Sequence, residues 1–317
     1  MRILDTAPGA KVLALGHYQP SKVVTNDDLA KTMDTNDEWI QSRVGIKERR
    51  VADGESLVDM ATQAGGKALA ASGLSAADID LVIVATCTLE SQIPNSSAVV
   101  AHRLGIDSPG AFDVNAACSG FCYALAAADS AVRGGSAKHV LVIGAEKLSQ
   151  WLDWTDRSTA VIFADGAGAA VVGPSDTPGI GPVVWGSSGD KYEAIRIPDR
   201  HGSLGQEGQT VFRWATTALH PVAKLACERA GVDPSELAAF IPHQANLRII
   251  ESIARKLGAD NAVVARDIVT AGNTSAASIP LALSRMLERG EIRSGGLALI
   301  LGFGAGLTYA GQVIEIP

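Results

Sequence analysis

The chain has 317 residues, of which 47% are hydrophobic and 19% are charged, and its formal net charge is −7 at neutral pH. This composition can bury a large core, which excludes global disorder and favours two domains or one large α/β unit. The acidic balance argues against nucleic acid or an anionic membrane as the main partner.

The cysteines and the first residues point to a reducing compartment. The four cysteines are Cys87, Cys118, Cys122 and Cys227, and none forms a C-x-x-C pair. So few cysteines in a long chain do not make a disulfide framework, and we expect no metal site. Residues 1–11 lack an apolar signal core, and no apolar run reaches the roughly 18 residues of a membrane span. We therefore expect a cytoplasmic protein.

The first half of the chain is predicted to alternate strands and helices. Its apolar run at 80–86 is nearly continuous, which is typical of a strand covered on both faces. In chain order we expect a strand at 11–16, helices at 26–33, 37–44 and 56–72, a strand at 80–86, a helix at 97–104, a strand at 113–114, a helix at 118–133, a strand at 139–144 and a hairpin over 160–173.

Residues 174–181 are rich in proline, glycine and small polar residues, so they form the best linker candidate. This places a domain boundary between residues 1–174 and 175–317. Beyond it we expect a helix at 212–230 that Pro221 kinks or splits, a strand at 237–241, a helix at 248–257, a strand at 263–269, a helix at 278–289 and a strand at 297–301.

The two halves contain an internal repeat. Residues 73–84 align with 231–242, residues 118–134 with 273–290, and residues 139–144 with 297–302. A period near half the chain length indicates duplicated domains. This alignment puts Cys118 and Asn273 at equivalent helix starts, related by a pseudo-two-fold axis, so that two half-sites would form one pocket.

Three polar turns, each after a predicted strand, carry chemistry. Cys118 lies where a strand turns into an alanine-rich helix, and first-turn N–H groups with the helix dipole would stabilise its thiolate. His243 and Asn273 begin similar turns downstream. Singly, each has an ordinary explanation: a small buried residue, a loop histidine and a helix N-cap. Together they suggest the nucleophile, base and polariser of an acyl-transfer enzyme.

Seven motifs follow one another in an order that is more specific than any one of them. They are Asp37-Glu38-Trp39-Ile40, residues 113–121 (DVNAACSGF), Thr155-Asp156-Arg157, residues 163–170 (FADGAGAA), residues 242–246 (PHQAN), residues 272–280 (GNTSAASIP) and residues 302–308 (GFGAGLT). With these motifs the chain resembles the β-ketoacyl-acyl-carrier-protein synthase III family of thiolase-fold condensing enzymes over its whole length. The resemblance implies a thiolase-like five-layer αβαβα fold of two duplicated halves, with a Cys118–His243–Asn273 site.

The asparagine separates this resemblance from others. Elongating synthases, thiolases and hydroxymethylglutaryl-CoA synthases replace one member of the triad, whereas chalcone synthases share it but are considerably longer. The implied reaction initiates fatty acid synthesis. An acyl-CoA primer acylates Cys118, whose oxyanion is held by the backbone N–H groups of Cys118 and Ala305. Malonyl-acyl carrier protein then decarboxylates beside His243 and Asn273, and its carbanion attacks the acyl group. No metal or redox cofactor is implied.

The resemblance also implies how the substrates are held. Trp39 and Arg157 would stack on the adenine of CoA, Arg43 and Arg248 would lie near its phosphates, and Asn246 would lie near the pantetheine arm.

The acyl pocket would be lined by Leu148, Phe163 and Ile93, the last entering from the partner subunit of a homodimer. Isoleucine is smaller than the phenylalanine of acetyl-preferring relatives, which allows a longer or branched primer. A basic patch for the acidic carrier protein would consist of Arg213, Lys224, Arg248, Arg255 and Lys256.

Three other hypotheses remain open. A starter-unit condensing enzyme or an acyltransferase of a secondary, polyketide-type pathway would keep the same triad. A catalytically silent thiolase-fold binding subunit is disfavoured by the intact triad. A nicotinamide-dependent oxidoreductase fits the α/β alternation but not the glycine spacing.

Overall fold

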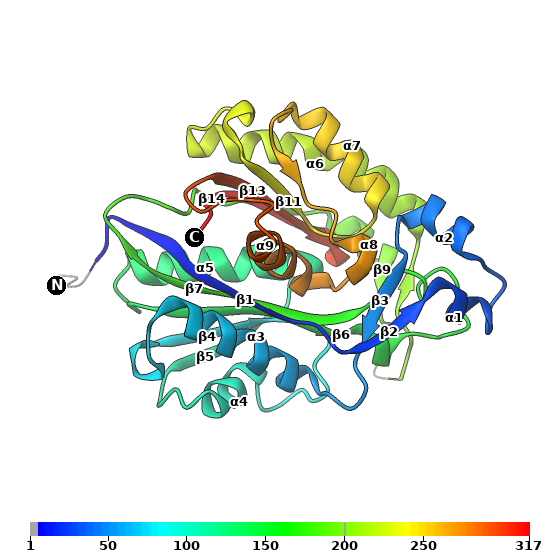
Figure 1. Cartoon of the computed structure of the whole chain (residues 1–317), viewed down its shortest axis with the longest axis horizontal. Helices are drawn as coiled ribbons and strands as arrows, with labels where there is room; N and C mark the ends of the chain where they lie inside the picture. Colours follow the sequence, from blue (N-terminus) through cyan, green and yellow to red (C-terminus); the bar gives the residue numbers. More distant parts are fainter. Residues whose placement is uncertain (1–5, 200) are drawn as a thin grey trace.

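The computed structural model describes residues 6–199 and 201–317 and contains two five-stranded sheets (Figure 1). The first sheet has the order β1 (Gly9–Tyr18), β7 (Asp165–Ser175), β6 (Val140–Lys147), β4 (Leu81–Ala85) and β5 (Gly110–Val114). The second has the order β12 (Val263–Val264), β11 (Ala239–Pro242), β13 (Leu297–Gly304), β14 (Thr308–Glu315) and β8 (Val184–Ser187). In each sheet three neighbouring strands pair in parallel, and the remaining two pairings are antiparallel.

Helices fill the other three layers. The outer face of the first sheet is covered by α3 (Leu57–Ser72) and α4 (Ser96–Arg103), and that of the second by α6 (Gly208–Ala230) and α7 (Leu247–Leu257). Between the sheets lie α5 (Gly120–Arg133) and α9 (Ser278–Glu288). The predicted five-layer αβαβα fold is confirmed. No helix of the described chain is long and apolar enough to cross a membrane.

Smaller elements gather at one end of the layers, on the right of Figure 1. They are the paired strands β2 (Lys22–Thr25) and β3 (Glu48–Val51), the helices α1 (Asn26–Ala30), α2 (Asp37–Val44) and α8 (Ile268–Ala271), and the paired strands β9 (Ile195–Arg196) and β10 (Gly205–Gln206). Local signals set several boundaries. At the start of α3, for example, Ser56 and Asp59 form a reciprocal capping box.

The two sheets match strand for strand, but the predicted repeat is misaligned at the turns that contain Cys118 and Asn273. Ala117 and Ser275 share a positive φ of 45° and 48°. In each half the asparagine two residues earlier accepts a hydrogen bond from that residue's N–H, over 3.3 Å for Asn115 and 2.8 Å for Asn273. Asn273 is therefore the counterpart of Asn115. The predicted equivalence of Asn273 with Cys118 is wrong.

The cause is a difference in helix length. The central helices α5 and α9 have 14 and 11 residues, so an alignment of their carboxyl ends is three residues out of register at their starts. Counted from the helix starts, Cys118 corresponds to Ala276, the middle residue of the one-turn helix before α9.

Other predicted elements also differ. The hairpin predicted over 160–173 is one strand, β7, because Gly168 serves a close approach and not a turn. A Cβ at this glycine would lie 2.4 Å from the backbone nitrogen of Leu281 in α9. The strand predicted over 263–269 is the two-residue β12 followed by α8, and Pro221 does not split α6.

Strands β8 and β14 were not predicted. The predicted domain boundary after residue 174 falls at the end of β7. Residues 1–5 of the predicted first half and residue 200 of the second lie outside the described residues.

Candidate active site

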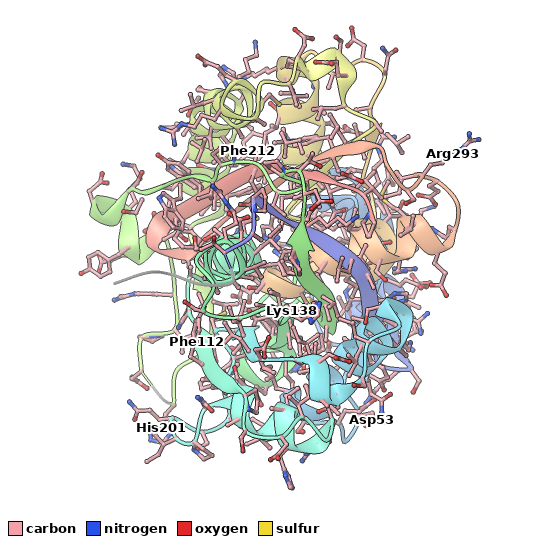
Figure 2. All side chains as sticks on the ribbon, turned by 90° about the vertical axis from the view of Figure 1, so that its left-hand side faces the viewer. Asp53, Phe112, Lys138, His201, Phe212 and Arg293 are labelled. Carbon is pink, nitrogen blue, oxygen red and sulfur yellow. The ribbon has the colours of Figure 1, made fainter. Side chains whose placement is uncertain are left out.

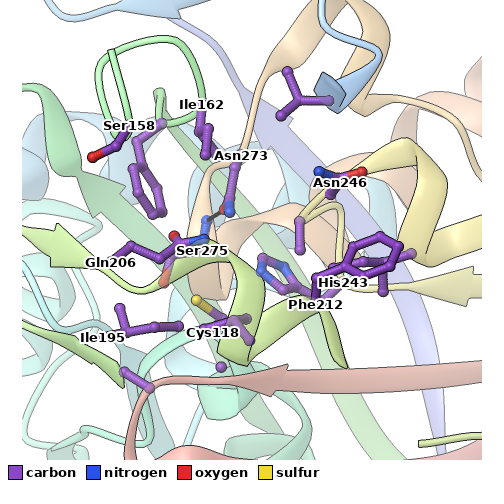
Figure 3. Close-up of a pocket in the computed structure, with 18 of the residues that line it drawn as sticks. Cys118, Ser158, Ile162, Ile195, Gln206, Phe212, His243, Asn246, Asn273 and Ser275 are labelled. Carbon is purple, nitrogen blue, oxygen red and sulfur yellow. Dashed lines mark hydrogen bonds between the residues drawn. The ribbon is translucent and has the colours of Figure 1, made fainter. Parts of the chain in front are cut away.

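Cys118, His243 and Asn273 line one cavity of about 840 Å³, in which their side chains point toward one another (Figure 3). Cys118 lies between β5 and α5, and His243 directly follows β11. Asn273 follows α8, and not a strand as predicted. Apolar side chains supply much of the wall: Leu148, Phe163, Ile195, Leu204 and Phe303.

The Cys118 side chain is 8% exposed, and burial raises the pKa of its thiol to about 11. The Ser275 hydroxyl and the backbone N–H groups of Ala305 and Cys118 oppose this rise. The effect of burial on the pKa is larger than the effect of these donors, so Cys118 is a thiol at neutral pH. The thiolate expected from its position at a helix start is therefore not the resting form. The sequence analysis assigned the backbone N–H groups of Cys118 and Ala305 to the oxyanion, and both groups lie next to this sulfur.

Strand β13 ends against Cys118. A Cβ placed on Gly304 would lie 2.8 Å from the Cys118 sulfur, so only glycine leaves room for the thiol there. The chain continues directly into Ala305, and this close passage brings the Ala305 N–H to the sulfur.

His243 is neutral and fixed in one orientation. It is 1% exposed, and burial lowers the pKa of its imidazole to about 3. Its Nδ1 lies 2.7 Å from the Ser278 hydroxyl, which also accepts the Gln244 N–H over 3.3 Å. These contacts are satisfied when Ser278 donates to Nδ1, which leaves the imidazole proton on Nε2. The ring packs edge-on against Phe303.

Asn273 presents its amide nitrogen to the cavity. Its Oδ1 accepts the Ser275 N–H over 2.8 Å, and its backbone is bonded on both sides, to Ile162 and to Ala164. Because the oxygen is held inside the turn, Nδ2 is the group left to donate. His243 and Asn273 thus provide two neutral N–H donors beside the Cys118 thiol.

The lowered pKa of His243 predicts a pH-dependent stability. The unfolded chain binds a proton near pH 6.5, whereas the folded chain binds it only near pH 3. The stability is therefore fully present above pH 6.5 and is lost as pH falls toward 3. Each pH unit between 6.5 and 3 lowers the free energy of unfolding by about 1.4 kcal/mol. Urea unfolding of the wild type and of His243→Asn at several pH values checks this, because the variant should lose less stability on acidification. Equal losses would contradict it.

Aromatic and cationic side chains form the mouth of the cavity. The Arg157 guanidinium lies over the Trp39 ring, 5.1 Å from its centroid, and that of Arg43 lies at 5.9 Å. Arg157 also donates to the backbone oxygen of Asp34 over 2.9 Å. Arg248 lies over Phe212, which sequence reasoning missed, at 5.0 Å. Four residues assigned to CoA therefore meet at one opening.

The remaining assigned residues fall into three groups. Asn246 lines the cavity, but its side chain caps α7 and donates to the Arg43 backbone oxygen. Leu148 and Phe163 line the cavity, whereas Ile93 is 81% exposed and not part of its wall in the described chain. The five basic residues of the patch are all exposed on α6 and α7: Arg213, Lys224, Arg248, Arg255 and Lys256.

Three polar residues near the sulfur were missed. Cys87 was interpreted as an ordinary buried cysteine, but it lines the cavity. Ser275 lies inside a recognised motif without having been assigned a role. Glu146 is the next-to-last residue of the apolar strand β6 and is fully buried. An acidic residue at the end of an otherwise apolar run was the available signal.

Two duplicated halves that enclose one cysteine-centred cavity define the class of protein, a thiolase-fold acyltransferase. Two family profiles match the chain. One, described as 3-oxoacyl-[acyl-carrier-protein (ACP)] synthase III, matches residues 112–189, and the other, described as its C terminal, matches residues 227–316.

Individual relatives agree. The β-ketoacyl-[acyl-carrier-protein] synthase III 4 of Streptomyces coelicolor is 57% identical, covering 98% of this chain and 99% of its own. The solved priming β-ketosynthase of the R1128 polyketide biosynthetic pathway is 43% identical with a TM-score of 0.97, covering 100% and 98%. The 3-oxoacyl-[acyl-carrier-protein] synthase III of Aquifex aeolicus is 44% identical with a TM-score of 0.92, covering 97% and 100%. The chain belongs to the β-ketoacyl-acyl-carrier-protein synthase III family.

Proposed function

We propose that the chain condenses an acyl-CoA primer with malonyl-acyl carrier protein, through an acyl-Cys118 intermediate, to initiate fatty acid synthesis. The observation that carries this proposal is one cavity in which a thiol, Cys118, lies with two neutral N–H donors, His243 and Asn273. The thiol suits the first half-reaction, acylation, and the two donors suit the second, decarboxylative condensation.

In the first half-reaction the Cys118 sulfur attacks the thioester carbon of the primer. A new C–S bond forms, and the oxyanion accepts the backbone N–H groups of Cys118 and Ala305. Each such preorganised donor contributes about 3 kcal/mol to the barrier reduction. Collapse of the tetrahedral intermediate breaks the old C–S bond and releases CoA as its thiol.

In the second half-reaction malonyl thioester loses carbon dioxide. The electron pair of the broken C–C bond becomes an enolate, whose oxygen accepts Nε2–H of His243 and Nδ2–H of Asn273. The enolate carbon then attacks the acyl group and expels the Cys118 sulfur. Thiol and amide chemistry supply every step, so the proposed reaction requires no metal or redox cofactor.

In the proposed reaction, CoA enters through the mouth of the cavity. Adenine between Trp39 and Arg157 needs roughly 7 Å, two carbon contact distances, and these groups are 5.1 Å apart. Arg157 therefore moves when CoA binds, breaking its bond to Asp34. The basic patch of α6 and α7 adjoins the same mouth through Arg213 and Arg248, where an acidic carrier protein would dock.

A homodimer is part of the proposal. β5 is the outermost strand of the first sheet, and its Phe112 is 40% exposed at the surface (Figure 2). Ile93, 81% exposed, is free to enter a partner's acyl pocket. A cytoplasmic location is likewise proposed, since the four cysteines are free thiols.

A second candidate function has a specific observation in its favour. The TM-score of 0.97 to a priming β-ketosynthase of a polyketide pathway supports a starter-unit condensing enzyme or an acyltransferase of such a pathway. That enzyme would keep the acyl-Cys118 intermediate and differ in its primer, carrier or acceptor.

Product analysis with a panel of acyl-CoA primers and malonyl-acyl carrier protein tests the proposal. We expect carbon dioxide, free CoA and 3-oxoacyl-carrier protein in equal amounts. Transfer of the acyl group to an alcohol or amine without release of carbon dioxide would instead identify an acyltransferase. No acylation with any primer would support the silent binding subunit.

A further inference from the structure

Glu146 is a buried carboxyl group that the proposed half-reactions do not use. Its Oε2 faces the loop after β4, where it accepts the Thr88 hydroxyl over 2.5 Å, the Thr86 hydroxyl over 3.1 Å and the Cys87 N–H over 3.2 Å. Within residues 6–199 and 201–317, no Lys, Arg or His forms an ion pair with it. A buried carboxyl group without a cation depends on its neutral donors, so these contacts are costly to lose.

The other oxygen of Glu146 anchors the turn that carries Asn273. Oε1 accepts the Ser275 hydroxyl over 2.9 Å and the Ala276 N–H over 3.4 Å. Because a backbone N–H can only donate, Oε1 accepts this bond whether or not the carboxyl group is protonated. Two successive residues of the turn are thereby tied to the end of β6.

Ser275 in turn fixes the Asn273 side chain. Its N–H donates to Asn273 Oδ1 over 2.8 Å, which leaves Nδ2 as the group directed at the cavity. Ser275 makes this bond with a φ of 48°, in the left-handed region that is unfavourable for a residue with a side chain. The two bonds to Glu146 offset this strain and hold the Ser275 N–H against the Asn273 oxygen.

The duplicated half contains the same turn without such an anchor. There Ala117 has a φ of 45° and donates to Asn115 Oδ1 over 3.3 Å. Alanine has no hydroxyl, and in the part of the chain that the structure describes no hydrogen bond joins residues 115–118 to a carboxylate. The anchored turn therefore has the shorter bond, and it is the turn whose asparagine lines the cavity.

We propose that Glu146 is a positioning residue for Asn273: by anchoring Ser275 and Ala276, it keeps the Asn273 amide directed at the enolate oxygen. The inference rests on the proposed decarboxylative condensation. Glu146 touches no reacting atom in that scheme. Its effect is therefore expected in the second half-reaction and not in acylation, where backbone N–H groups hold the oxyanion.

Glu146→Ala and Glu146→Gln form the decisive pair. Alanine removes the acceptor, so release of carbon dioxide from malonyl-acyl carrier protein should fall about 10²-fold, the cost of a misplacement of about 1 Å. Glutamine keeps an oxygen for Ser275 and Ala276, and its rate should stay near that of the wild type. Acylation, followed by intact mass, should persist in both variants. A wild-type rate in Glu146→Ala, or an equal loss in both half-reactions, would overturn the inference.

Ser275→Ala tests the anchor from its other end, should Glu146→Ala not fold. It removes the hydroxyl but keeps the N–H, so the loss should be smaller and confined to decarboxylation. In an Asn273→Ala background it should cause no further loss, because it acts through the amide that is missing. Thr88→Val is the matched control, since it removes a bond to the other oxygen of Glu146. A loss in this control as large as in Ser275→Ala would contradict the assigned role.

Crystal structures of the wild type and of Ser275→Ala give a readout that needs no substrate. The distance from Asn273 Oδ1 to the backbone nitrogen of residue 275 should lengthen from 2.8 Å toward the 3.3 Å of the unanchored turn. An unchanged distance would overturn the inference. Absence of carbon dioxide release from the wild type would instead contradict the proposed function, and this distance would still decide whether the anchor positions Asn273.

Discussion

Cys118→Ala will carry no acyl group after incubation with any acyl-CoA, whereas the wild type will gain one acyl mass. The reason is that the Cys118 sulfur is the attacking atom of the proposed reaction, and alanine has no sulfur. Intact-protein mass spectrometry measures both. Cys122→Ala is the matched control, because Cys122 is a fully buried thiol of the same helical region that does not line the cavity. It should acylate as the wild type does.

An acyl group on the Cys118→Ala variant would contradict this expectation. Cys87 would be its first suspected site, because it is the other thiol in the cavity wall. Peptide mapping locates the modified residue. Acylation at Cys87 would move the nucleophile from the helix start of α5 to the loop after β4.

Asn273→Ala should separate the two half-reactions. Acylation of Cys118 should persist, because the oxyanion is held by backbone N–H groups. Release of carbon dioxide from malonyl-acyl carrier protein should fall by about 10²- to 10³-fold, the usual cost of one preorganised donor. Acyl-enzyme mass and labelled carbon dioxide, followed in parallel, measure the two steps.

The duplicated fold supplies the control for this experiment. Asn115 accepts the Ala117 N–H as Asn273 accepts that of Ser275, but Asn115 is exposed and outside the cavity wall. Asn115→Ala removes the same turn contact without touching the chemistry, so its condensation rate should stay near that of the wild type. Equal losses in both variants would assign Asn273 a role in the turn alone.

Much of the fold could be predicted because its signals are local. Helix α2 was predicted with its observed bounds, since Asn36 caps its start and Gly45 ends it in the left-handed region. The prediction of a hairpin over 160–173 was wrong, because the sequence alone does not distinguish a glycine required by close packing from one required by a turn. The place of Gly168 against α9 depends on residues more than a hundred positions away.

The candidate site was likewise predictable only in part. The motifs around Cys118, His243 and Asn273 identified the three residues, because their order and spacing are written in the chain. The register of the turns that contain Cys118 and Asn273 was predicted wrongly, because the central helices that follow them differ in length.

The sequence by itself determined the family and its class of chemistry, and it identified Cys118, His243 and Asn273 as the residues proposed to carry that chemistry. Only the tertiary structure decided their states: a protonated thiol, a neutral imidazole and an amide turned by Ser275. It also placed the buried Glu146 carboxylate in hydrogen-bond contact with Cys87 and Ser275 of the cavity wall. The physical reason is that protonation and orientation depend on desolvation and on hydrogen-bond partners, which come from segments distant in the chain and meet only when the two halves close around one cavity.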